Sequence, residues 1–427
     1  MTKIKQEDRS LKIALFTALG SGLEYYDFVV YGVMAKYLSE VFFATEDAIS
    51  AGIQTFGIFA IGYFVRPFGG TFVGMIADIY GRKKSFIIVM LIMAFSTLAI
   101  GLLPTYEQIG IFAPFLLLIC RALQGLSFGA EVPGATTIIS EFSTKGRLGI
   151  LTSIMLASTN VGAVLATGIL ALLSNLFTHD HIMSGLWRLP FFIGGFLAIV
   201  AYYIRQKISE TPEFEVELDQ GEKKILTPLK ILLKGHVSKL LIAFSMTLFL
   251  STAVILSIYS PSYIHKYFNY ALPEIYTAMT ISLVCATFFN IMAGWISDNV
   301  ARLKILAFCL IIWAIVVHPV FTLLENGTYF ALQMFLIINQ LFIAIFFTAF
   351  LPILPRLFPT NIRYTGVALG YNLGFSISST IPAVASYFLS TLGSPFALEL
   401  FYVTPLVLAL TSVCALMKMT GANGYVY

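Results

Sequence analysis

Twelve long apolar runs constrain the fold of this chain more than any other feature of its sequence. Each run holds roughly 20 or more mostly apolar residues, the length that a helix needs to cross a bilayer. Inside the hydrocarbon a backbone must satisfy its hydrogen bonds within its own segment, so such runs fold as helices. The runs lie at about 12–38, 49–77, 85–103, 112–141, 147–173, 187–207, 239–264, 274–297, 304–324, 328–356, 362–390 and 397–418. The sequence therefore predicts an all-α integral membrane protein with twelve transmembrane helices.

The composition of the chain argues against an ordinary soluble enzyme. Of its 427 residues, 58% are hydrophobic and only 11% are charged, and the mean hydropathy is +0.87. The four cysteines lie far apart within apolar runs, and the sequence holds neither a metal-binding spacing nor a Gly-x-x-x-x-Gly-Lys-[Ser/Thr] phosphate loop. We therefore expect no metal, no cofactor and no enzymatic activity, and transport that is not driven directly by ATP.

A loop motif that ends one apolar run returns far downstream. The segment Gly74–Lys84, which reads Gly-Met-Ile-Ala-Asp-Ile-Tyr-Gly-Arg-Lys-Lys, has a weaker copy in Gly294–Lys304, 220 residues later. Nearly the same offset, 216 residues, separates Phe142–Arg147 from Phe358–Arg363. Two pairs with nearly equal offsets indicate an internal repeat, in which one membrane unit occurs twice along the chain. A membrane protein made of two parallel halves is typical of transporters.

The basic residues predict how the chain is oriented and divided. With the N-terminus inside, 21 of the 26 Lys and Arg residues lie in cytoplasmic loops and helix ends. The net charge of +4 then reports topology and does not indicate nucleic-acid binding. We expect a multi-pass inner-membrane protein with both termini in the cytoplasm. Its parts would be an N-terminal six-helix bundle (1–208), a cytoplasmic linker (209–238) and a C-terminal six-helix bundle (239–427).

Four further stretches carry a resemblance to a known family. They are Gly20–Gly32, Arg66–Gly70, Arg121–Glu131 and Leu357–Asn372. With the twelve runs and the paired loops, they make the chain resemble the major facilitator superfamily. Within it, the chain is similar to the metabolite:proton symporter family, which includes carriers of proline and betaine, of 2-oxoglutarate and citrate, and of shikimate. The resemblance implies the major facilitator fold and proton-coupled transport by alternating access.

Five ionisable side chains fall inside the expected spans of the first half. At about 1.5 Å per residue, four of them lie roughly 15 to 22 Å from the cytoplasmic surface, and Arg121 lies about 30 Å from it. Charges at such depth are costly and usually mark a pathway, a proton relay or a counter-ion pair. The second half has no charge at comparable depth, so we expect proton chemistry in the first half and neutral substrate contacts in the second. The five residues are Glu24, Asp27, Arg66, Arg121 and Glu131.

The acids of the first span are candidates for proton coupling. Glu24 and Asp27 are three residues apart and project from one helical face, and two nearby carboxylates in a low dielectric disfavour double ionisation. By the resemblance, Asp27 would pair with Arg121, and Glu24 and Glu131 are further relay candidates. The alternative is a static network of buried ion pairs that holds the helices together. Arg66 is either an anchor for a substrate anion or a partner of Glu24.

Neutral polar residues are the substrate-binding candidates of the second half. The first span of each three-helix repeat is expected to line the cavity, and these spans offer Tyr259, Asn339 and Gln340. The eleventh span adds Tyr371 and Asn372. Buried amides are expensive in lipid, so Asn339 and Gln340 should face protein or water.

The first span adds aromatic candidates for the cavity wall. Tyr25 and Tyr31 could make cation–π contacts to an ammonium group. Once Arg121 is occupied by Asp27, Arg66 is the strong anion site that remains. We therefore expect a substrate with one carboxylate and little excess negative charge, such as an amino acid or a betaine, in preference to a tricarboxylate.

The repeated loop predicts a conformational latch. Asp78 and its counterpart Asp298 end a helix, where a carboxylate can accept charge-assisted hydrogen bonds from basic groups and from backbone N–H groups of a neighbouring helix. Arg82 is the basic member of the first copy. Two departures from the family pattern, Ile79 and Ala301, predict a somewhat looser latch. The alternative for the basic residues is simple anchoring at the membrane surface.

These observations predict a secondary transporter that couples inward proton flow to uptake of a small polar metabolite. Its expected partners are that substrate, protons and the lipid bilayer, without nucleic acid, and we expect a monomer. Two alternatives are a proton-coupled exporter of drug-like or siderophore-like molecules and a nutrient sensor that kept the fold but no longer transports.

Overall fold

The chain is helical throughout the part that the structure describes. The computed structural model describes residues 3–43, 48–80, 82–143, 146–206, 227–359, 362–392 and 398–420. These ranges contain α-helices, short 3-10 helices and turns, and no β-strand. The expected all-α fold is confirmed.

The first half consists of long helices joined by short connections. Its α-helices are α1 (Lys3–Val33), α2 (Ala35–Phe42), α3 (Ala48–Phe64), α4 (Arg66–Tyr80), α5 (Arg82–Leu102), α6 (Tyr106–Ile109), α7 (Phe112–Phe142), α8 (Leu148–Leu176), α9 (His179–Met183) and α10 (Leu189–Gln206).

The second half repeats this pattern of long helices. Its α-helices are α12 (Thr227–Gly235), α13 (Val237–Phe268), α14 (Leu272–Asn299), α15 (Arg302–Thr322), α16 (Tyr329–Phe350), α17 (Arg363–Ser378), α18 (Ile381–Leu392) and α19 (Leu400–Thr420). The helix α12 occupies part of the expected linker, and residues 209–226 of that linker lie outside the described ranges.

The helices coincide with the predicted apolar runs. Nine helical segments of the described chain are long and apolar enough to cross a membrane, and Ile87–Leu102 is a shorter apolar helix. The runs 12–38, 49–77 and 362–390 each fold as two consecutive helices, α1 with α2, α3 with α4, and α17 with α18. The chain is thus a multi-pass membrane protein, and the number of twelve crossings stays a prediction.

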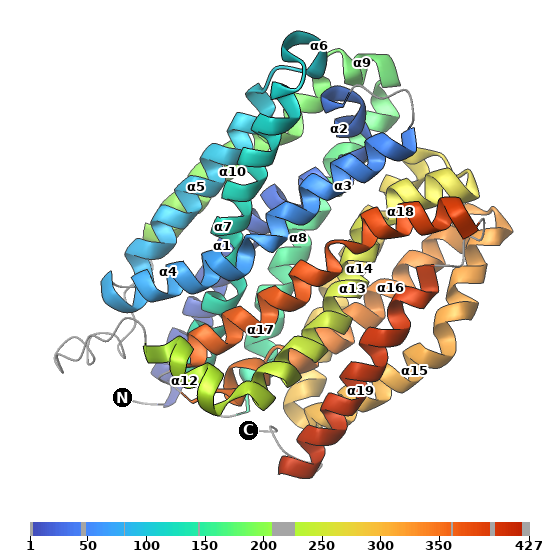
Figure 1. Ribbon diagram of the computed structural model, residues 1–427. Coiled ribbons are helices and arrows are strands. Elements are labelled where there is room, and N and C mark those ends of the chain that lie inside the picture. Colours follow the sequence, from blue (N-terminus) through green and yellow to red (C-terminus); the bar gives the residue numbers. More distant parts are fainter. Residues whose placement is uncertain are drawn as a thin grey trace.

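The two halves lie side by side. Figure 1 shows the first half in blue to green and the second half in yellow-green to red. They meet most extensively where α8 packs against α14, and again where α4 and α7 pack against α17. The beginning of α1 and the end of α19 both lie at the lower end of the molecule in Figure 1, which we call the terminal end.

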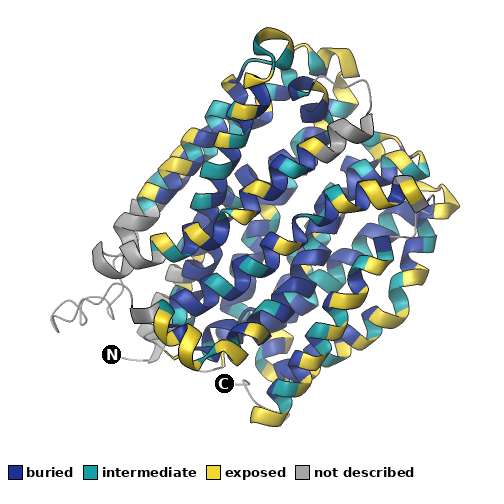
Figure 2. Cartoon of the chain, in the orientation of Figure 1, coloured by how far each residue is buried: buried dark blue, intermediate teal, exposed yellow. Residues whose placement is uncertain are grey.

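The polarity of the molecule is inverted relative to a soluble protein. Large apolar side chains cover the outside: Phe68 and Phe330 are each 73% exposed, and exposed residues line the outer helix faces in Figure 2. Five charged side chains of the described first half, among them Asp27, Arg66 and Arg121, are at most 3% exposed. An apolar perimeter around a charged interior is the arrangement that lipid requires.

Glycines let α3 and α4 approach α7 through their backbones. A Cβ added to Gly125 would overlap the carbonyl oxygen of Gly62, and one added to Gly129 would overlap the carbonyl of Arg66. Small residues at such crossings are a common way for membrane helices to pack closely. The close crossing brings the two buried arginines of α4 and α7 to the same aromatic ring: Arg66 and Arg121 lie 3.9 and 4.5 Å from the centroid of Phe28.

Candidate functional site

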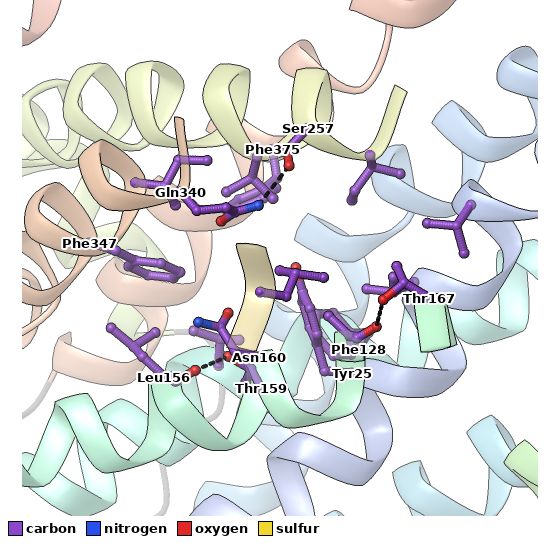
Figure 3. A pocket seen from close by; sticks show the side chains of 18 of the residues that line it. Tyr25, Phe128, Leu156, Thr159, Asn160, Thr167, Ser257, Gln340, Phe347 and Phe375 are labelled. Atoms are coloured by element: carbon purple, nitrogen blue, oxygen red, sulfur yellow. Dashed lines mark hydrogen bonds between the residues drawn. The ribbon is translucent and has the colours of Figure 1, made fainter. Parts of the chain in front are cut away.

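A central cavity lies between the two halves. Its empty space amounts to about 850 Å³, counting the part that opens to solvent, which suits a small metabolite. Figure 3 shows side chains from α1, α7, α8, α13, α16 and α17 around this space. Its polar and aromatic lining comprises Tyr25, Tyr63, Arg66, Phe128, Thr159, Asn160, Thr167, Ser257, Gln340, Phe347, Tyr371 and Phe375.

Arg66 is the one charged side chain among the described residues that line the cavity. Its guanidinium carbon lies 3.7 Å from the ring centroid of Tyr63 and 4.5 Å from that of Phe128. It forms no ion pair with a described carboxylate, so the expected alternative of a Glu24 partner is not observed. Its Nε is buried without a hydrogen-bond partner in the described ranges. A rigid, aromatic-lined cation with an unused donor is suited to bind a carboxylate.

The opposite wall of the cavity is neutral and polar. Gln340 Nε2 donates to Ser257 Oγ at 2.9 Å, and Asn160 on α8 is half-buried at the same space (Figure 3). A smaller continuation of the cavity reaches Asn290 on α14, whose Oδ1 accepts from Thr348 Oγ1 at 3.2 Å. The second half, together with Asn160 of the first, therefore offers amides and hydroxyls, which can bind neutral or hydrogen-bonding groups of a substrate.

Asp27 and Arg121 are both buried in the first half, away from the cavity lining. The direct ion pair expected between them does not form in the described structure. Instead, Arg121 Nη1 donates to Gln124 Oε1 at 2.7 Å, and its guanidinium lies 4.2 Å from the ring centroid of Tyr31. Asp27 faces α10, where a Cβ added to Gly194 would overlap its Oδ1. The coupling role of this pair stays a prediction.

The other two acids of the first half lie at the interface of α1 with its neighbours. Glu131 Oε1 accepts a hydrogen bond from Ser21 Oγ at 2.7 Å, which ties α7 to α1. Glu24 is 3% exposed. Neither residue is part of the cavity lining.

Four predicted substrate residues lie outside the central cavity. Tyr31 stacks on Phe59 and donates to the Thr55 carbonyl, and Tyr259 pairs with Ser386 at 2.9 Å. Asn372 donates to the Gly129 carbonyl at 2.8 Å and so joins the two halves directly. Asn339 lines a separate small pocket inside the second half. Of the predicted substrate residues, the lining includes Tyr25, Arg66, Gln340 and Tyr371.

Two helices that line the cavity carry no predicted substrate residue. The prediction covered the first span of each repeat together with Arg66 and the eleventh span, but α8 and α14 line the cavity as well. Asn160 and Thr159 on α8 were therefore not singled out. A signal was present, because Asn160 is an amide in a long apolar run, where a polar group needs a protein or water neighbour.

Asp298 forms a contact between the halves at the terminal end. Its carboxylate accepts hydrogen bonds from the backbone N–H groups of Gly149 at 2.6 Å and of Ile150 at 2.9 Å, at the first turn of α8. Arg302 Nη2 donates to the same carboxylate at 2.8 Å. An anion at a helix N-terminus satisfies free N–H groups and complements the helix dipole. The side chains of Asp78 and Arg82, the other predicted latch residues, lie outside the described part.

We expect Asp298→Asn to open the terminal end more often. The amide keeps the shape but loses the charge and one of the two acceptor oxygens, which should shift the equilibrium about tenfold. The measurement is the rate at which an impermeant maleimide, added from the terminal side, modifies a single cysteine at Thr159 in a background free of other cysteines. Asn299→Ala is the control, because among the described residues Asn299 bonds only to the Trp295 carbonyl of its own helix. Equal rates in both variants would contradict a latch at Asp298.

A second contact joins the halves at the opposite end. Lys36 Nζ on α2 lies 3.1 Å from His265 Nε2 on α13, and His265 Nδ1 lies 2.9 Å from the Tyr270 carbonyl. A carbonyl only accepts, so Nδ1 carries the hydrogen and Nε2 presents its lone pair to the ammonium group. Tyr276 on α14 donates to the Val33 carbonyl at 3.1 Å and adds to this contact. Contacts between the halves thus lie on both sides of the cavity.

We expect His265→Lys to open this end, and His265→Gln to leave it closed. The lysine places a second ammonium group against Lys36, at a cost of about 1 kcal/mol or more, whereas a glutamine oxygen can still accept from Lys36. The readout is maleimide modification of the same cavity cysteine from the opposite side of the membrane, which should be at least about fivefold faster in the lysine variant. A glutamine variant as open as the lysine variant would show that the polar contact does not matter.

Comparisons with known proteins agree with this architecture. A model of the Major Facilitator Superfamily matches residues 17–272 and 241–423. The chain is 32% identical over 395 residues to the proline/betaine transporter of Salmonella typhimurium, with 89% of this chain and 78% of that protein covered. It is 30% identical over 393 residues to a glycine betaine/proline/ectoine/pipecolic acid transporter of Dickeya dadantii, with 90% and 78% covered.

Solved structures show the same fold. The crystal structure of a D-xylose-proton symporter matches with a TM-score of 0.73 at 18% identity, over 94% of this chain and 96% of that one. A partially occluded inward-open conformation of the xylose transporter from E. coli matches with a TM-score of 0.73 at 14% identity, over 96% and 97%. These relatives are transporters and not enzymes. The chain therefore belongs to the major facilitator superfamily.

Proposed function

We propose that this protein is a proton-coupled symporter that takes up a small zwitterionic metabolite by alternating access. The observation that carries the proposal is the central cavity between the halves, with Arg66 as its one charged lining residue in the described ranges. A substrate with one carboxylate would neutralise this charge, whereas a tricarboxylate would leave two negative charges in a low dielectric. Two relatives of the chain are transporters of proline and betaine and of ectoine, which supports the same substrate class.

The aromatic lining supports a cationic group at the other end of the substrate. Tyr25, Phe347 and Tyr371 line the same cavity as Arg66 and come from three different helices. A quaternary or secondary ammonium group is attracted to aromatic ring faces. Gln340 and Asn160 would hydrogen bond the remaining polar atoms of the substrate. This arrangement binds both ends of a zwitterion without a protein carboxylate in the cavity.

Proton coupling is assigned to the buried charges of the first half. Asp27 would take up and release the proton, and Glu24 and Glu131 are the further carboxylates through which it could pass. Arg121 would be the cation that acts on Asp27 in this coupling. The domain assignment follows: bundle 1–208 carries the proton chemistry, and bundle 239–427 provides neutral contacts to the substrate.

We assign the terminal end to the cytoplasm, so that both termini are cytoplasmic. The excess of Lys and Arg in the loops of this side supports the assignment. Asp298, together with Asp78 and Arg82 of the first motif copy, would then latch the cytoplasmic side while the substrate binds from outside. The protein would work as a monomer in the lipid bilayer, because each chain contains both halves of the cavity.

Transport into proteoliposomes tests this function. Purified protein is reconstituted, and uptake of radiolabelled glycine betaine and proline is measured with the outside one pH unit more acidic than the inside. We expect accumulation that disappears when a protonophore collapses the gradient. Less uptake under an acidic exterior would indicate an exporter, and ligand binding without any flux would indicate a sensor. Either result would overturn the proposal.

A further inference from the structure

A chain of hydrogen bonds leads from Arg121 towards Asp27. Arg121 Nη1 donates to Gln124 Oε1 at 2.7 Å, and Gln124 Nε2 donates to Thr97 Oγ1 at 2.8 Å. The side chains of Arg121, Gln124 and Thr97 are all completely buried, on α7 and α5. Buried polar groups in lipid-embedded helices need hydrogen-bond partners. Here each of these side chains is the partner of the next one in the series.

The direction of this chain is fixed by its donors and acceptors. The amide oxygen of Gln124 is used by a guanidinium group that can only donate, so its NH₂ group has to point to Thr97. The Thr97 hydroxyl accepts this bond and is left to donate its own hydrogen onward. The group that it can donate to is the Asp27 carboxyl, which packs with Thr97 against the same glycine of α10. The same glycine of α10, Gly194, lies against both Asp27 Oδ1 and Thr97 Cγ2.

The other carboxyl oxygen of Asp27 has no such neighbour. Oδ1 is buried and has no hydrogen-bond partner among the described residues. The titratable or charged groups of its surroundings are Glu24, one helical turn earlier on α1, Tyr26, its neighbour in the chain, and Arg121 on α7, which is linked to Thr97 through Gln124. Tyr26 donates its hydroxyl to the Pro190 carbonyl at 2.6 Å, so that hydrogen is not available to Asp27.

We propose that Thr97 and Gln124 are positioning residues that connect Arg121 to the proton-accepting carboxyl of Asp27. The proposal rests on the proposed symport function and adds residues to it. When Asp27 loses its proton from Oδ1 to water, the remaining carboxylate keeps the hydrogen bond that Thr97 donates. Arg121 polarises this bond through Gln124, because successive hydrogen bonds strengthen one another in a low dielectric. The arginine therefore stabilises the anion without touching it.

The decisive variant is Thr97→Val, which removes the hydroxyl and keeps the shape of the side chain. Without its donor the carboxylate is less stable, so Asp27 should hold its proton to higher pH. We expect the midpoint of the pH profile of substrate exchange to rise by about one unit or more. Thr97→Ser restores the hydroxyl and should restore the wild-type profile. Thr136→Val is the control, because Thr136 is equally buried but, within the described ranges, bonds only to the Val132 carbonyl of its own helix.

Gln124→Met interrupts the chain at its other link and should shift the profile in the same direction. It also keeps the test decisive if the valine variant does not fold. A wild-type pH profile in Thr97→Val, or in Gln124→Met where only that variant folds, would overturn the positioning role of Thr97 and Gln124 while leaving symport intact. A wild-type protein without any proton-dependent uptake would instead overturn the proposed function. A purely structural role of Thr97 would lower stability or maximal rate and leave the pH midpoint in place.

Discussion

An Asp27→Asn variant should lose proton-driven accumulation and keep a measurable part of substrate exchange. Asparagine has nearly the shape of aspartate but takes up and releases no proton in the working range of pH. Asp27 does not line the cavity, so the binding surface should survive the change. A difference of one pH unit is worth about 1.4 kcal/mol per proton, hence a tenfold concentration ratio in the wild type. In the variant this ratio should fall to about one.

Counterflow in proteoliposomes distinguishes a loss of proton coupling from a general loss of folded, active protein. Exchange of labelled against unlabelled substrate requires binding and alternating access but no net proton movement. Glu107→Gln, the same chemical change at an exposed site of α6, is the control and should behave as wild type. If Asp27 served only a static network, stability, accumulation and exchange would all decline together. A variant that still concentrates substrate with an unchanged pH dependence would exclude Asp27 as the coupling residue.

An Arg66→Gln variant should bind substrate about 100-fold more weakly. Removing one partner of a buried charge pair costs a few kcal/mol, because the substrate carboxylate is left in the cavity without a cation. Arg66→Lys should recover only part of this loss, since an ammonium group lacks the planar face that contacts Tyr63 and Phe128. The dissociation constant for glycine betaine, measured by scintillation proximity or by ligand-dependent thermal stabilisation, reports the change.

The matched control is Lys266→Gln, which removes a positive charge from an exposed position at the end of α13. Its affinity should stay within about twofold of wild type. Saturable binding of a tricarboxylate that survives Arg66→Gln, with no response to betaines or amino acids, would contradict both the anchor and the zwitterionic substrate.

The sequence allowed the fold to be predicted because bilayer thickness and backbone hydrogen bonding leave few solutions for long apolar runs. Burial of the charged residues was also predictable, since Asp27, Arg66 and Arg121 lie in the middle of such runs. Their partners were not. Gln124 and Thr97 are neutral residues on two different helices, and nothing local distinguishes them from ordinary polar contacts between helices.

Two adjacent amides show why the cavity itself was only partly predictable. Gln340 lines the central cavity and Asn339 a separate pocket, because successive residues of a helix point about 100° apart. The rotation of α16 is set by its neighbours, and its sequence is apolar almost all round. Likewise, Asp298 was recognised as a potential acceptor, but its donors at Gly149 and Ile150 follow from where the tertiary fold places the first turn of α8.

The uneven distribution of buried charge has a consequence for the energy source of transport. The described first half encloses three carboxyl groups and two guanidinium groups, whereas the described second half buries only one charged side chain, Arg302, which lies at the terminal end. With all acids ionised the enclosed charge is −1, and a proton on Asp27 brings it to zero. With the proposed zwitterionic substrate and Asp27 as the proton site, loading leaves the enclosed charge at zero, so the conformational change that carries the substrate inward moves no net charge through the membrane field. The empty, deprotonated protein encloses a net charge of −1. A membrane potential of 100 mV therefore changes the free energy of its return to the outward-facing state by up to about 2.3 kcal/mol. The voltage-sensitive step is then the return of the empty protein to the outward-facing state. An interior-negative potential pushes the enclosed negative charge outward and so accelerates uptake.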